Sequence, residues 1–115
     1  MTAGDVRRGD VWDAQLDKVR SVVVITRRAI VDVLSNLTVT PITSVSRGIR
    51  TEVSLGPDAG VDEGSVVSCD NIQTISKRRL VRRRGQVSGD EMLSIDEATI
   101  LAIASEPDYH SGRYR

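Results

Sequence analysis

Four β-branched residues in succession, from Val22 to Ile25, constrain this chain more than any other feature of its sequence. Branching at Cβ favours an extended backbone, and the run has no alternation of polar and apolar residues. A strand that can expose neither face to water belongs inside a sheet with both faces covered. The run therefore predicts a buried strand that needs further strands beside it and apolar layers on both sides.

Further strands are predicted from shorter patterns bounded by turn residues, over residues 8–16, 37–43, 51–55, 65–69 and 72–75. Pro41 interrupts the second of these. Proline cannot donate a ladder hydrogen bond, so we expect a bulge or a sheet edge next to Ile42 and Thr43. Such bends are common beside active sites, where they aim a side chain.

Two helices are predicted. Ser88 and Glu91 fit a capping box, in which each side chain bonds the other residue's backbone N–H. The apolar residues that follow recur at helical spacing, while Asp96 and Glu97 are expected to face outward. That apolar stripe consists of Met92, Ile95, Ala98 and Leu101 or Ala102. The segment from Arg27 to Leu34 is a second, shorter candidate.

Several strands followed by one long helix predict an α+β fold built on a strongly bent antiparallel sheet. The 115 residues are enough for one ordinary domain. We assign it to residues 1–107 and expect residues 108–115 to form a flexible tail. The longest apolar run, Ile100 to Ala104, is too short to cross a bilayer, and no secretory leader is recognisable, so we expect a cytoplasmic protein without membrane contact.

Charge is balanced overall, with 16 basic and 16 acidic residues, so only its local distribution can indicate a partner. Six of the eight residues from Lys77 to Arg84 are basic. One interpretation is a solvated strand and turn, balanced by Asp58, Asp62, Glu63 and the helix acids. The other is an electrostatic track for RNA phosphates or for an acidic protein segment.

Most familiar catalytic groups are missing from the sequence. The single histidine, His110, excludes a paired-histidine mechanism, and the single cysteine, Cys69, excludes a cysteine-rich metal site. No metal or cofactor is expected. Arg20 opens the buried strand and Thr43 closes the next one, which would hold a guanidinium and a hydroxyl at strand ends, suited to a phosphate. A strand-end arginine can equally form a surface ion pair.

The order of four motifs resembles the MazF/PemK family of toxin ribonucleases. These motifs are Arg8-Gly-Asp-Val-Trp12, Arg20-Ser-Val-Val-Val-Ile-Thr26, Leu37-Thr-Val-Thr-Pro-Ile-Thr43 and the segment Ser65 to Ile75. The resemblance implies a small SH3-like barrel with a C-terminal helix, used as a homodimer. It also implies cleavage of single-stranded RNA at short preferred sequences without a metal, leaving a cyclic phosphate. The expected partner is a MazE-like antitoxin that lays an extended, partly acidic segment along the toxin.

The same resemblance implies the site residues. Arg20 and Thr43 take the catalytic positions, and Ser44, Asn71 and Gln73 fall where the family contacts RNA. Lys77 and Arg78 of the basic run are added as RNA-binding candidates.

Two departures from the family pattern stand beside the site. Ser21 replaces the usual proline after the arginine, which predicts a less restrained backbone there. The loop at residues 17–19 is shorter than usual and lies next to the site.

Two other functions remain open at this point. A CcdB-like toxin on the same fold would poison gyrase through its terminal helix and would not need Arg20. A family member that has lost activity would only bind its antitoxin.

Overall fold

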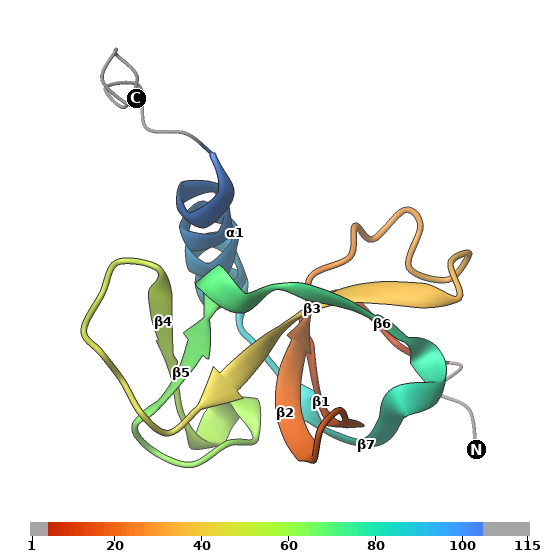
Figure 1. The fold of residues 1–115 in the computed structure, drawn as a ribbon, viewed down its shortest axis with the longest axis horizontal. Helices are drawn as coiled ribbons and strands as arrows, with labels where there is room; N and C mark the ends of the chain where they lie inside the picture. The colour runs from red at the N-terminus through yellow and green to blue at the C-terminus, as the bar shows by residue number, and fades with distance from the viewer. Residues whose placement is uncertain (1–4, 105–115) are drawn as a thin grey trace.

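The computed structural model describes residues 5–104, and the predicted domain end at residue 107 and tail at 108–115 lie outside the described residues. Within these described residues, seven strands precede one α-helix (Figure 1). The strands are β1 (Asp10–Gln15), β2 (Val19–Val24), β3 (Asn36–Thr43), β4 (Glu52–Leu55), β5 (Ser65–Ser68), β6 (Gln73–Ser76) and β7 (Leu80–Gln86). The helix is α1 (Gly89–Ile103), and the 3-10 turns are η1 (Pro57–Ala59), η2 (Cys69–Asn71) and η3 (Lys77–Arg79).

β3 is the strand on which the sheet divides. One edge pairs with β2, while the other edge pairs with β6 along residues 36–39 and with β5 at residues 42–43. Pro41 faces Val22 of β2 and lies between the residues paired with β6 and those paired with β5. The predicted irregularity at Pro41 is therefore an exchange of partner strands, at the point where a missing N–H disrupts the ladder least.

The sheet is strongly bent but is not a closed barrel, because β4 and β7 form the two ends of its strand order. η1, which follows β4, packs against β7 in the gap. A Cβ on Gly85 would lie 2.5 Å from the Ala59 carbonyl oxygen, and one on Gly60 would lie 2.3 Å from the Arg84 carbonyl oxygen. Two glycines thus allow a backbone contact where a closed barrel would have a ladder.

The apolar interior forms two clusters, one on each face of the central strands. Val22 and Val24 belong to one cluster, and Val23 belongs to the other. All three side chains have no exposed surface. The prediction that this strand is buried on both faces is confirmed.

α1 begins as the capping box predicts. Ser88 Oγ accepts from the Glu91 N–H at 3.0 Å, and Glu91 Oε1 accepts from the Ser88 N–H at 2.8 Å. Ile95 and Ala98 are buried as the helix packs against β4 and η2.

One expectation about α1 was wrong, because Asp96 is partly buried in an ion pair instead of facing solvent. Its carboxylate accepts from the Arg8 guanidinium, which also donates to the Ile25 carbonyl. The Arg8 and Asp96 side chains are 21% and 41% exposed.

The helix predicted from Arg27 to Leu34 was also wrong. Its N–H groups bond back to the Arg27 and Ile30 carbonyls in successive turns that do not continue into a helix. Only Val31 is buried, whereas Leu34 is 41% exposed and Val33 is 77% exposed. A short segment rich in β-branched residues needs a packed face to remain helical, and here one side chain alone reaches the core.

Within residues 5–104, no helix combines the length and the apolar character needed to cross a membrane.

Candidate active site

Four of the sequence-predicted site residues meet in one open cavity of about 490 Å³, which we call the Arg20 cavity. It lies where β3 leaves β6 for β5, beside the tip of the β1–β2 hairpin. Arg20, Thr43, Asn71 and Gln73 line it, and the other lining residues are Leu16, Asp17, Pro41, Ile42, Val45, Arg47, Glu52 and Ser68. Ser44 follows Thr43 on an exposed position outside this lining.

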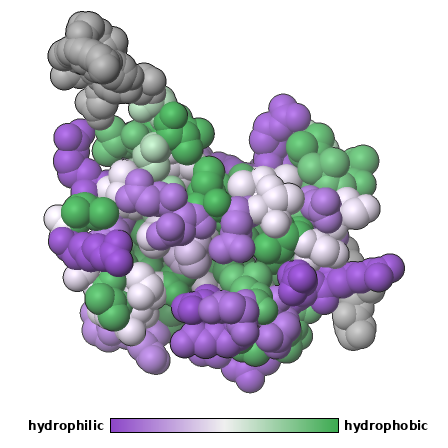
Figure 2. Space-filling model, in the orientation of Figure 1, coloured by the Kyte–Doolittle hydropathy of each residue, from purple (hydrophilic) through white to green (hydrophobic). Residues whose placement is uncertain are grey.

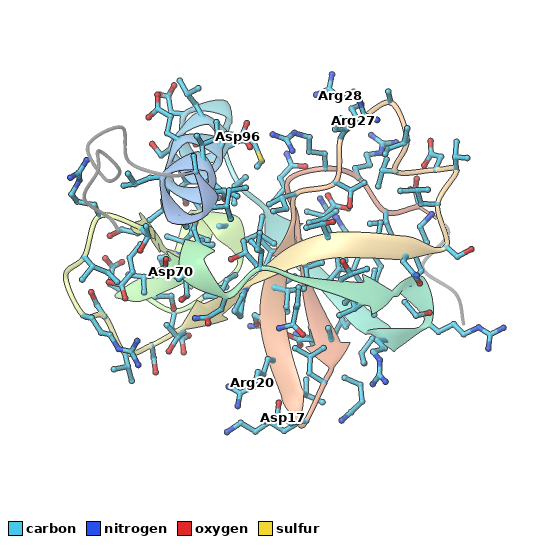
Figure 3. The ribbon with its side chains drawn as sticks, turned by 45° about the horizontal axis from the view of Figure 1, so that its top comes forward. Asp17, Arg20, Arg27, Arg28, Asp70 and Asp96 are labelled. Carbon is cyan, nitrogen blue, oxygen red and sulfur yellow. The ribbon has the colours of Figure 1, made fainter. Side chains whose placement is uncertain are left out.

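Arg20 stands at the point where β2 leaves the core. The strand is exposed at Val19 and Arg20 and fully buried from Val22 onward, so the hairpin tip projects from a rigid base. Arg20 Nε and Nη2 donate to the two carboxylate oxygens of Asp17 at 2.9 and 3.0 Å. Figure 3 shows the two side chains next to each other at the hairpin tip.

This two-point contact fixes both charges. The hydrogen bonds from Arg20 hold the pKa of Asp17 far below the usual carboxylate range. The same hydrogen bonds raise the pKa of Arg20. Asp17 is therefore a poor base and Arg20 a permanent cation whose Nη1 group remains available to an anion.

Ser21, at the position where the family pattern has proline, is held by side-chain hydrogen bonds. Its Oγ donates to Asp13 Oδ1 at 2.9 Å, and Asp13 Oδ2 accepts from Arg84 Nη1 at 3.3 Å. Asp13 lies directly opposite Ser21 in the β1–β2 pair. A hydroxyl anchored to β1 and β7 supplies a restraint where the family pattern has a proline ring.

Another part of the cavity lining is polar and is formed by Thr43 and the amide side chains of Asn71 and Gln73. Thr43 is the last residue of β3, and its Oγ1 accepts from the Val45 N–H at 3.1 Å. Asn71 Nδ2 donates to Ser68 Oγ at 2.7 Å, which orients that amide, and Gln73 begins β6. The wall thus presents a hydroxyl and two amides, groups that bond phosphate oxygens or base edges.

The sequence reasoning missed three charged residues of the cavity: Asp17, Arg47 and Glu52. An acid three residues before Arg20 in a tight hairpin was a usable signal for Asp17, since a hairpin turn returns the chain close to itself. Glu52 accepts hydrogen bonds from the segment at residues 46–48, across a loop, and no local pattern indicates this pairing.

The basic run mostly takes its solvated form, with different partners from those expected. Lys77 and Arg78 lie in η3 beyond β6, outside the lining of the Arg20 cavity. In β7, Arg83 pairs with Asp10 at 3.4 Å and Arg84 with Asp13 at 3.3 Å. The compensating acids therefore come from β1, because β1 is the strand paired with β7.

The fold is that of a small α+β protein with one bent antiparallel sheet and one C-terminal helix, and the cavity brings together cationic and hydrogen-bonding side chains suited to a phosphate. The family model described as "PemK-like, MazF-like toxin of type II toxin-antitoxin system" matches residues 7–103. A relative named Endoribonuclease MazF3 from Mycobacterium tuberculosis is 44% identical over 85 residues, which cover 74% of this chain and 82% of the relative. This chain belongs to the PemK/MazF-like toxin family of type II toxin–antitoxin systems.

Solved structures agree with this assignment. The "Mycobacterium tuberculosis toxin MazF-mt6" superposes with a TM-score of 0.77 and is 41% identical, covering 81% of this chain and 94% of that one. A structure titled "Endoribonuclease in complex with its cognate antitoxin from Mycobacterial species" has a TM-score of 0.79 at 25% identity, covering 85% and 94%.

Proposed function

We propose that this toxin cleaves single-stranded RNA in the Arg20 cavity, by attack of a ribose 2′-OH on the adjacent phosphorus. The chain is an endoribonuclease of the toxin–antitoxin kind, as its family and its relative named an endoribonuclease indicate. The proposed site is supported by one observation: the same cavity is lined by Arg20, Thr43, Asn71 and Gln73.

The proposed reaction needs no nucleophile from the protein. A bond forms between the 2′-oxygen and phosphorus while the bond from phosphorus to the 5′-oxygen breaks, giving a 2′,3′-cyclic phosphate and a 5′-hydroxyl. The 2′-OH proton leaves to water, and the departing 5′-oxygen takes one from water. The chain's task is to align the strand and stabilise the extra negative charge on the phosphoryl oxygens.

Arg20 and Thr43 supply that stabilisation. Asp17 occupies Nε and one Nη2 hydrogen of Arg20, which leaves the Nη1 donors for the phosphoryl oxygens. Removing a preorganised donor of this kind typically lowers kcat by about 100-fold to 1,000-fold. Thr43 gives a second donor, because its Oγ1 accepts from the Val45 N–H and so keeps its own hydrogen for another bond.

The preference for particular RNA sequences is assigned to the polar side chains of the cavity lining and to Ser44 beside it. Asn71 and Gln73 carry both donors and acceptors and can bond the edges of unstacked bases, and Ser44 lies beside Thr43. Lys77 and Arg78 follow β6 and would attract phosphates further along the strand.

The proposed partners are a MazE-like antitoxin and a second copy of the chain. A structure of similar fold contains a cognate antitoxin. The outward side of α1 exposes Leu93, Ile100 and Ile103, at 58%, 61% and 66% of their surfaces. They share one stripe of the helix, and Figure 2 shows hydrophobic side chains gathered over α1.

The homodimer can be tested at this stripe. Ile100→Asp should shift the protein from dimer to monomer in light scattering, whereas Val81→Asp, at a residue 60% exposed on β7, should not. A dimer that tolerates Ile100→Asp would place the interface elsewhere. We also propose a cytoplasmic location, which suits an RNA substrate and the single buried Cys69.

Among the three functions left open by the sequence, the relative named an endoribonuclease favours RNA cleavage over gyrase poisoning. The test is to incubate the purified protein with a long single-stranded RNA in chelator and to map the ends. We expect discrete cuts with cyclic-phosphate ends, and no cut where the preceding ribose is 2′-deoxy. Intact RNA from a folded protein that still arrests growth would support the gyrase-type alternative, and intact RNA without arrest would support an inactive antitoxin binder.

A further inference from the structure

We propose that Arg47 binds a second phosphate of the RNA strand, and that Glu52 holds the loop that presents Arg47 to the cavity. The inference rests on the proposed function and adds a subsite to it. It begins from the connection between β3 and β4, residues 44–51.

This connection is folded around an internal anion. Glu52, the first residue of β4, accepts from the Arg47 N–H at 3.0 and 3.1 Å, from the Gly48 N–H at 3.0 Å and from Ser46 Oγ at 3.0 Å. Gly48 has a φ of +69°, in the left-handed region that glycine adopts without strain. Successive N–H groups that converge in this way form a concave anion site, and here the protein's own carboxylate fills it.

The carboxylate is ionised in this setting. Partial burial alone would raise the pKa of Glu52, but the hydrogen bonds from Arg47, Ser46 and Gly48 outweigh it and lower the pKa. The loop therefore keeps its internal anion at neutral pH. Its backbone is held in one conformation before any substrate arrives.

The consequence is that Arg47 has a fixed backbone and an uncommitted side chain. Arg47 lines the same cavity as Arg20 and Thr43. Within residues 5–104 its guanidinium takes part in no hydrogen bond or ion pair, while Asp17 is occupied by Arg20 and Glu52 by the loop. Asp17 is thus paired with a cation, the Glu52 oxygens are held by donors of the loop, and neither acid bonds the Arg47 guanidinium, which is left to attract an external anion.

An RNA strand is the anion that fits two arginines in one open cavity. About 490 Å³ lies within the range of about 300–1,000 Å³ found for ligand sites, and consecutive nucleotides bring consecutive phosphates. With Arg20 on the reacting phosphate, Arg47 takes a neighbouring one and so fixes the strand's register. Arg47 is a binding residue, and Glu52 is a positioning residue that acts through it.

The variant Arg47→Ala isolates the guanidinium, because alanine retains the N–H that bonds Glu52. We expect kcat/KM on a short RNA with one cleavage site to fall about 10-fold to 100-fold, mainly through KM. The slope of log kcat/KM against log salt should become shallower by about 0.7, the value for one phosphate of a single strand. Arg50→Ala is the matched control, since Arg50 lies in the same loop but lines a groove against α1.

Replacing single linkages of this RNA by a neutral methylphosphonate locates the phosphate. At one linkage, other than the cleaved one, wild type and Arg47→Ala should react at equal rates. Glu52→Gln should lower kcat/KM in the wild type and add little in the Arg47→Ala background, with the melting temperature followed to exclude unfolding.

The outcomes separate the two proposals. If the wild type cleaves RNA and the kcat/KM of Arg47→Ala is within twofold of the wild-type value, the proposed subsite is overturned and the proposed function is not. A change in the preferred base without a matching methylphosphonate position would make Arg47 a base reader and also overturns it. RNA left intact by the wild type overturns the proposed function together with the subsite.

Discussion

The ion pair between Arg8 and Asp96 joins α1 to the sheet, and its removal gives a stability change that can be worked out from the structure. Exposed ion pairs contribute about 0.2–1 kcal/mol, whereas removing one partner of a fully buried pair costs about 3–5 kcal/mol. Side chains that are 21% and 41% exposed lie between these limits, and Arg8 retains its bond to the Ile25 carbonyl. We therefore expect Asp96→Ala to lower the free energy of unfolding by about 2 kcal/mol.

For a domain of about 100 residues, 1 kcal/mol corresponds to roughly 4–8 °C in melting temperature, so Asp96→Ala should melt about 10 °C lower. Thermal unfolding is followed by circular dichroism at one fixed protein concentration, because association shifts the midpoint. Glu97→Ala is the matched control. It removes an exposed acid from the next position of α1, and its effect should stay within about 0.5 kcal/mol.

Asp96→Asn, which keeps an acceptor but not the charge, should fall between the two. A loss in Asp96→Ala no larger than in Glu97→Ala would show that the helix is held by apolar packing alone. The conclusion that the Asp96 ion pair stabilises the packing of α1 on the sheet would then be wrong.

Three further predictions follow from the cavity and its support. Ser21→Ala should lower kcat for RNA by several-fold with little change in KM, and Ser21→Thr, which retains a hydroxyl, should recover most of it; equal rates in all three proteins would remove the anchoring role. Gly85→Ala should destabilise the fold by more than about 2 kcal/mol in chemical denaturation, because its Cβ would meet the Ala59 carbonyl oxygen at 2.5 Å, and a neutral effect would contradict the tight contact. Asp17→Asn should lower kcat without changing the shape of the pH profile between about pH 5 and pH 8. The lowered pKa of Asp17 keeps its ion pair with Arg20 intact until the pH falls far below the usual carboxylate pKa of about 4. A step in the wild-type pH profile between about pH 5 and pH 8 that is absent from the variant would refute this prediction.

Local patterns in the sequence predicted the parts of the fold that depend on neighbouring residues. Ser88 and Glu91 lie three positions apart, so their reciprocal hydrogen bonds can be recognised from the sequence. The valines of β2 likewise predict burial on both faces, because a β-branched run without polar positions has no solvent side. Arg20 and Thr43 were predicted near strand ends because each borders an apolar run, and in the structure both line one cavity.

Features that depend on distant residues could not be predicted in this way. Arg8 and Asp96 are 88 positions apart, and only the packing of α1 on the sheet brings them together. The segment at residues 27–34 has a helical pattern, but a pattern does not provide the surface that a helix must pack against. The positions of Arg47 and Glu52 in the cavity depend on the conformation of one loop. That conformation includes a positive φ at Gly48 and backbone N–H groups that converge on Glu52.

The most direct test of the proposed reaction is the single-turnover rate of RNA cleavage in chelator for wild type, Arg20→Ala and Arg28→Ala. Arg28 is also an exposed arginine, but it lies at the opposite end of the molecule from Arg20 in Figure 3. We predict that Arg20→Ala, with the same fold and oligomeric state as the wild type, loses about 100-fold or more in rate, while Arg28→Ala cleaves normally. Wild-type cleavage by Arg20→Ala would contradict the assignment of the chemistry to this cavity.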